Sequence, residues 1–117
     1  MKFKLIVAMV QDAKTDAVTE AARASGATGC TVITNARGEG LRPSSTFLGL
    51  TLEGLRDVVL LLVEEHRSRA VLEAIGEAGK FEHEAGAGVA FQIDIEDTIG
   101  LHAQIQEISR DYEEEEL

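Results

Sequence analysis

The chain has 117 residues, a formal net charge of −10 at neutral pH and a pI of about 4.6. This negative balance disfavours nucleic acid and anionic membrane surfaces as partners, because both are polyanions that most of the surface would repel. The length suits one domain, and 44% hydrophobic residues are enough for a core. Five of the acids lie in the last seven residues, so the rest of the chain is only moderately acidic.

Cys30 is the only cysteine, so no intrachain disulfide can form, which fits a reducing compartment. Its position in an expected strand, between Gly29 and Thr31, predicts a small buried residue rather than a reactive thiol. The apolar N-terminus lacks the cleavage site of a signal peptide, and no apolar run approaches the ~20 residues of a membrane span. We therefore expect a cytoplasmic protein that does not insert into a membrane.

The first half of the chain reads as strand, helix, strand. A nearly continuous apolar run over Phe3–Val10 predicts a strand with most of its surface buried, central in the sheet. Asp12 is placed to cap a helix over Ala13–Ser25 with a mostly alanine apolar face, and Gly26 suits the position after its end. A strand rich in β-branched residues then runs from about Gly29 to Ala36.

Turn formers cluster over Arg37–Ser45 and predict a loop, in which Gly38 and Gly40 lie between two arginines. Glycine lets backbone N–H groups turn toward a ligand, and arginine is a forked cationic donor, so this loop is a candidate anion site. The same pattern is also typical of an ordinary turn. A short extended arm over Thr46–Thr51 precedes a strongly apolar strand over Arg56–Glu64.

The second half repeats the layout of the first. A helix is expected over His66–Gly79, with a buried stripe formed by Val71, Leu72, Ile75 and Ala78. A glycine-bearing loop over Lys80–Gly88 leads to a last strand over Val89–Ile95. The polar sequence after it, over His102–Glu116, suits a C-terminal helix that frays into the acidic run.

The order of these elements predicts an α+β, ferredoxin-like βαββαβ fold, in which two helices cover one face of a four-stranded antiparallel sheet. We divide the chain into this domain, residues 1–101, and a C-terminal helix and acidic tail, residues 102–117. The strands over Phe3–Val10 and Val58–Val63 are apolar on both faces. The sheet face without helices should therefore also be buried, most economically in an oligomer.

Three short motifs coincide with this order: Thr28-Gly29-Cys30-Thr31-Val32, Gly38-Glu39-Gly40 and Gly86-Ala87-Gly88-Val89-Ala90-Phe91. With the long loop between the second and third strands, they resemble the PII signal-transduction family over roughly residues 1–101. The sequence is more similar to a divergent PII-like subgroup than to the nitrogen regulators proper. The resemblance implies a homotrimeric regulator rather than an enzyme.

It also implies that an adenine nucleotide (ATP, ADP or AMP, with or without Mg²⁺) binds in clefts between subunits. A loop called the T-loop, here Arg37–Leu50, then engages or releases a target protein, for which a membrane transporter is one candidate. This segment has no tyrosine, so the uridylylation of a T-loop tyrosine known in the family is excluded by residue type.

Carried over residue by residue, the resemblance assigns three groups of binding positions. The adenine-contacting positions are Val7, Gly29, Thr31 and Val63. The phosphate-side loop is Gly38, Glu39, Gly40, Leu41 and Arg42. The facing loop, which comes from the neighbouring subunit, is Gly86, Ala87, Gly88, Val89 and Ala90.

The cleft implied by the resemblance departs from the family pattern in its charge. The family carries a basic residue after the second Gly-x-Gly and arginines after the last strand, where this chain has Val89 and Gly100, Leu101 and His102. Arg42, Arg37 and Lys80 remain as candidate cations. With fewer cations the grip on a triphosphate should weaken, so AMP or ADP should bind as well as ATP or better.

Two other function classes stay open. The first is a trimeric metal-tolerance or structural protein of the CutA type, which shares the fold and binds no nucleotide. The second is a small ferredoxin-like enzyme, for which the sequence offers no nucleophile elbow. His66 and His83 lie beside acids but lack a second histidine at ligand spacing, so solvated histidines are favoured over a metal site.

Overall fold

The computed structural model describes residues 2–37, 46–47, 50–51 and 56–101. Most of the expected T-loop, including the whole phosphate-side loop Gly38–Arg42, lies outside the described residues. So does the expected C-terminal helix over His102–Glu116. The boundary between the domain and the C-terminal tail therefore stays a prediction.

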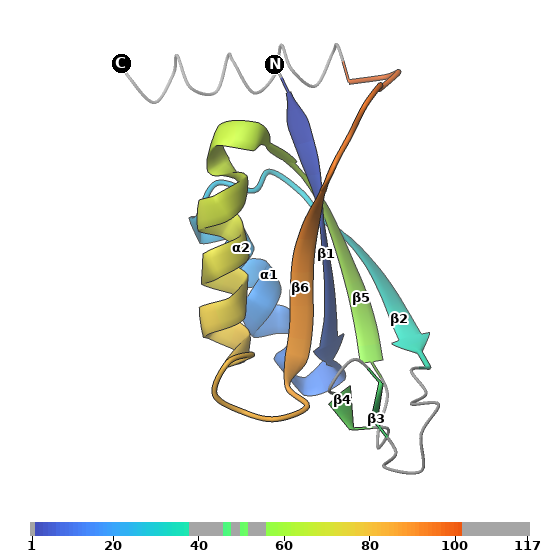
Figure 1. Ribbon diagram of the computed structural model, residues 1–117, viewed down its shortest axis with the longest axis vertical. Coiled ribbons are helices and arrows are strands. Elements are labelled where there is room, and N and C mark those ends of the chain that lie inside the picture. Colours follow the sequence, from blue (N-terminus) through green and yellow to red (C-terminus); the bar gives the residue numbers. More distant parts are fainter. Residues whose placement is uncertain (1, 38–45, 48–49, 52–55, 102–117) are drawn as a thin grey trace.

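Four strands form one antiparallel sheet in the order β2-β5-β1-β6. The strands are β1 (Phe3–Gln11), β2 (Thr31–Ala36), β5 (Arg56–Glu64) and β6 (Gly88–Asp94). The two longest and most apolar strands, β1 and β5, are central, and β2 and β6 are the edges (Figure 1). This confirms the central place predicted for the first strand. The extended arm is a separate pair, β3 (Thr46–Phe47) with β4 (Leu50–Thr51).

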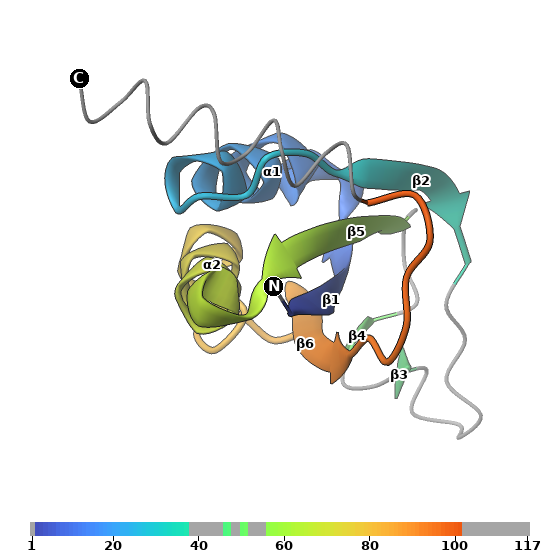
Figure 2. The same ribbon diagram turned by 90° about the horizontal axis from the view of Figure 1, so that it is seen from above.

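The helices α1 (Thr15–Ala24) and α2 (Glu65–Gly79) lie side by side on one face of the sheet (Figures 1 and 2). Alternate residues of β1 and β5 point into the layer between sheet and helices, where Val18 and Ala22 of α1 and Val71 and Ile75 of α2 meet them. The expected ferredoxin-like βαββαβ architecture is confirmed. None of the helices among the described residues is long and apolar enough to cross a membrane.

No helix of the described residues covers the other face of the sheet, and we call it the open face. The strand register places rows of apolar residues on it, because the residues between the core positions point the other way. One such row runs Thr31, Leu60, Val7, Phe91 across all four strands. Phe91 on the edge strand is 38% exposed in the single chain, whereas Val7 and Leu60 on the central strands are partly buried.

The start of the first helix differs from the prediction. Asp12 caps neither helical segment: it begins a short 3₁₀ turn, η1 (Asp12–Lys14), which follows Gln11 without a side-chain cap and runs into α1. The helix is instead anchored by Thr15, whose hydroxyl donates to the buried carboxylate of Asp57 on β5 at 2.6 Å. The end is as expected, since Gly26 adopts a φ of 110° after Ser25.

The burial predicted for Cys30 is wrong, because its thiol is exposed in this chain. The second strand begins at Thr31 rather than Gly29, so Cys30 lies in the connection that precedes it. β2 is also an edge strand and is exposed over most of its length. An apolar sequence pattern does not distinguish such an edge from a central strand.

Candidate functional site

Two of the predicted adenine-contacting positions, Val7 on β1 and Thr31 on β2, lie in one row of the open face with β5 between them. Val7 and Thr31 both pair with Leu60 of β5, from opposite sides, so they belong to one row across the sheet. Gly29 and Thr31 line a hollow of about 390 Å³. Its remaining lining is mostly apolar and comes from Phe3, Leu5, Thr28, Cys30, Leu60, Leu62 and Leu101. An apolar hollow beside an exposed glycine backbone suits a flat, weakly polar group such as a purine ring.

Val63 lies on the opposite face of the sheet from this hollow. Its side chain is 4% exposed and belongs to the core beneath the helices. It can therefore offer a ligand only its backbone groups, or act by supporting β5. Successive residues of a strand point to opposite faces of the sheet. This alternation could have shown from the sequence that Val63 faces the core while Val7 faces the open side.

The facing loop Gly86–Ala90 lies at the other edge of the sheet, where the loop after α2 enters β6. Gly86 has a φ of 79°, a conformation that favours glycine. Position 88 has no room for a side chain, because a Cβ atom there would lie 2.4 Å from Cε1 of Phe81 and 2.8 Å from the carbonyl oxygen of Met9. Ala87 is buried and its N–H donates to the Glu84 carbonyl oxygen at 3.1 Å.

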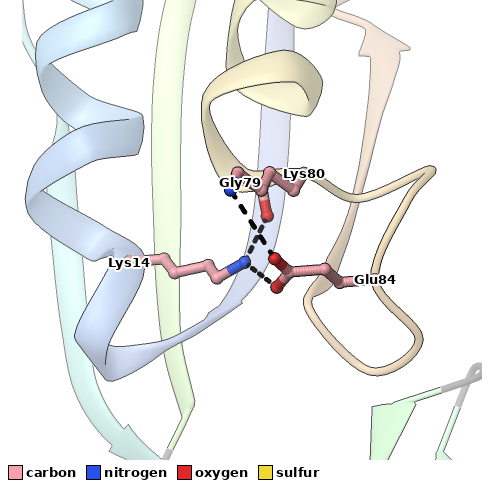
Figure 3. Close-up of polar contacts among 4 residues, drawn as sticks. All are labelled: Lys14, Gly79, Lys80 and Glu84. Carbon is pink, nitrogen blue, oxygen red and sulfur yellow. Dashed lines mark hydrogen bonds and ion pairs between the residues drawn. The ribbon is translucent and has the colours of Figure 1, made fainter.

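Lys14, the last residue of η1, forms polar contacts with this loop and with the end of α2. The Nζ atom of Lys14 donates to the carbonyl oxygen of Gly79 at 2.9 Å and to the Glu84 carboxylate at 2.5 Å (Figure 3). The hydrogen bond from Lys14 lowers the pKa of Glu84 below its ordinary value. Lys80, expected as a cleft cation, has its Nζ atom 3.8 Å from the same carboxylate. Sequence reasoning missed Lys14 because nothing local links two residues that are 70 positions apart.

The two groups of predicted positions are far apart in one chain. Gly29 and Thr31 are at the β2 edge of the sheet and the facing loop is at the β6 edge, with β5 and β1 between them (Figure 2). Three interstrand spacings amount to roughly 14 Å. The structure therefore places Gly29 and Thr31 beside one hollow and apart from Gly86–Ala90, whereas Val7 on β1 lies between the two groups, next to β6.

The histidine and acid groups do not converge on a metal site. His66 lies 3.1 Å from the buried carboxylate of Glu64, but its imidazole is largely exposed at the surface. His83 lies exposed in the loop after α2. Over the part of the chain that the structure describes, no three metal-ligating side chains come together.

Comparisons with known proteins agree with this fold. Among solved structures, CPII of Thiomonas intermedia K12 is similar in two forms. The form described as bound to ADP, AMP and acetate has a TM-score of 0.65 and 22% identity, and covers 86% of this chain and 92% of its own. The apo form, described as a nitrogen regulatory PII-like protein, has a TM-score of 0.63 and 22% identity, with 81% and 90% covered.

A protein of Thermus thermophilus, described as PII-like and signalling, has a TM-score of 0.60 and 23% identity, with 81% of this chain and 88% of its own covered. At these identities the likenesses establish the fold. No curated protein sequence matches the chain significantly. The family model described as "Nitrogen regulatory protein P-II" matches residues 3–104, and the chain therefore belongs to the PII family of regulatory proteins.

Proposed function

We propose that this PII family member binds an adenine nucleotide in clefts between the subunits of a homotrimer. The observation that carries the proposal is the separation of the two predicted groups of binding positions. Gly29 and Thr31 lie at one edge of the sheet and Gly86–Ala90 at the other edge of the same chain, roughly 14 Å away across two intervening strands. A neighbouring copy that brings its β6 edge to this β2 edge completes the cleft, and a closed ring repeats that contact.

The open face supports the ring. It presents apolar side chains from all four strands, among them Ile33, Phe91 and Ile93, which are 49%, 38% and 48% exposed in the single chain. A contiguous apolar surface of this kind is typical of an interface between subunits. Packing the open faces against one another would cover it and would place neighbouring sheet edges side by side.

ADP and AMP are the nucleotides we expect to bind best. CPII, whose fold is similar, is described as bound to both. The facing loop of this chain has Val89 where the family pattern has a basic residue, so a γ-phosphate would gain less from the cleft than in other members. In our proposal Arg42, Arg37 and other parts of the T-loop contact the phosphates. The nucleotide binds with or without Mg²⁺.

The signal would pass through the T-loop. This segment follows β2 directly, so a nucleotide that contacts Thr31 and Arg37 lies at the base of the loop. Ligand-dependent ordering of such a loop can create or remove a binding surface for a target protein. We propose a cytoplasmic target or the cytoplasmic side of a membrane transporter, and no nucleic acid, because the chain has a net charge of −10.

Calorimetric titration of the purified protein with ATP, ADP and AMP tests the proposal, and native mass measurement tests the trimer. We expect saturable heat with ADP and AMP at one site per subunit. No heat with high micromolar nucleotide, together with clear heat for a divalent metal, would favour the CutA-like alternative. A stable monomer would contradict the intersubunit cleft.

A further inference from the structure

The loop that joins α2 to β6, residues 80–87, depends on contacts with other parts of the chain for its place. Hydrogen bonds within it, such as Glu84 N–H to the Lys80 carbonyl at 3.0 Å, give it a shape, and the Phe81 N–H attaches its start to the Gly76 carbonyl of α2 at 3.0 Å. Lys80 turns the chain out of α2 in the left-handed conformation, with a φ of 57°. The contact of Gln11 N–H with the Ala87 carbonyl is long, at 3.4 Å.

Lys14 provides the strong polar attachment seen in Figure 3. Its ammonium group bridges the last carbonyl of α2, at Gly79, and the carboxylate of Glu84 in the loop. A cation at a helix C-terminus is favourable, because the last carbonyl groups have no partner within the helix. The side chain of Lys14 is 21% exposed and that of Glu84 is 49% exposed, so solvent only partly screens the contact.

We propose that Lys14 and Glu84 are positioning residues for ligand binding: their bridge holds the α2–β6 loop so that the backbone of Gly86–Ala90 is preformed. This inference rests on the proposed function, since it concerns the facing loop of the same cleft. The bridge acts in two ways. It fixes the loop before the ligand arrives, which lowers the ordering cost of binding, and it neutralises a carboxylate that lies two residues before the predicted facing positions and would repel an anionic ligand there.

Amide hydrogen exchange tests the first effect without any nucleotide. Lys14→Met should speed exchange within residues 81–87, while α1 and β1 stay protected. Lys4→Met is the matched control, because Lys4 makes a similar bridge to Asp94 at the other end of β1. Equal exchange of the loop in the wild type and Lys14→Met would overturn the positioning role.

Calorimetric titration with ADP tests whether the bridge contributes to ligand binding. Lys14→Met should weaken binding by about two- to fivefold, the range expected for an ordered surface bridge, and Lys14→Arg should restore most of it. Glu84→Gln changes both effects in opposite directions, because its amide oxygen accepts a weaker hydrogen bond from Lys14 and the negative charge is removed. We expect a smaller loss than for Lys14→Met. Binding tighter than the wild type would show that Glu84 acts by charge alone, and would overturn its positioning role.

The two proposals fail in different ways. If the wild type binds ADP and Lys14→Met binds it as tightly as Lys4→Met does, this inference fails and the proposed function stands. If the wild type binds none of the three nucleotides, the proposed function fails and the role in ligand binding fails with it. The exchange experiment then reports whether the bridge still orders the loop.

Discussion

Replacing Gly88 with alanine should destabilise the fold, although the family resemblance assigns Gly88 to the nucleotide cleft. The added Cβ atom would lie 2.4 Å from Cε1 of the Phe81 ring and 2.8 Å from the carbonyl oxygen of Met9. The ring can move, but the carbonyl belongs to a central strand and cannot move without disturbing the sheet. Overpacking of this kind costs about 1–3 kcal/mol, and we expect about 2 kcal/mol in the free energy of unfolding.

Urea unfolding at a fixed protein concentration measures this loss, because the stability of an oligomer depends on its concentration. Gly29→Ala is the matched control. A Cβ atom there meets nothing within 4 Å, so its stability should stay within about 0.5 kcal/mol of the wild type. Adding Phe81→Leu to Gly88→Ala should recover part of the loss. Equal stability of Gly88→Ala and Gly29→Ala would refute the packing argument.

Four further predictions follow from the same geometry. Gly29→Leu should leave the fold intact and weaken ADP binding by about tenfold in calorimetry, and unchanged affinity would show that the hollow is not the site. Val89→Lys should tighten ATP binding by about three- to tenfold and AMP binding less, whereas equal gains would argue against a phosphate contact. Phe91→Asp should yield monomers in native mass measurement, because it charges the open face, and an intact trimer would contradict that interface. Their lysine partners lower the pKa values of Glu84 and Asp94 below the ordinary pKa values of 4.5 and 3.8. Both bridges therefore stabilise the fold fully when the pH is above these ordinary pKa values, and this stabilisation is lost as the pH falls through the lowered pKa values. Thermal unfolding from about pH 5 to pH 3 should show this fall, and a Lys4→Met/Lys14→Met variant with the same pH profile would contradict it.

The fold could be predicted because its sequence signals are local. The apolar runs at Phe3–Val10 and Arg56–Glu64 and the helical spacing of Val71 and Ile75 reproduce the observed elements closely. Gly26 marks the end of α1 through its positive φ. The errors occur where burial depends on the place of a strand in the sheet, as for Cys30 beside the β2 edge.

The candidate site could be predicted only in part. Val7 and Thr31 lie in one row of the open face on either side of Leu60, and the register that aligns them is a property of the folded sheet. The bridge between Lys14 and Glu84 joins residues that are 70 positions apart, so one sequence gives no sign of it. Charge and composition disfavoured nucleic acid and anionic membranes as partners, and only the folded sheet places Gly29 and Thr31 beside one hollow.

Mixed trimers test the intersubunit cleft most directly. Subunits with Gly29→Leu lose the β2 side of the cleft, and subunits with Val89→Glu lose the facing-loop side, so neither trimer alone should bind ADP well. After the two are unfolded together and refolded at equal amounts, about one cleft in four should combine two intact sides from different subunits and recover wild-type affinity. Calorimetry of the mixture should show that fraction of sites. No recovery, with mixed trimers present by native mass, would contradict a cleft shared between subunits.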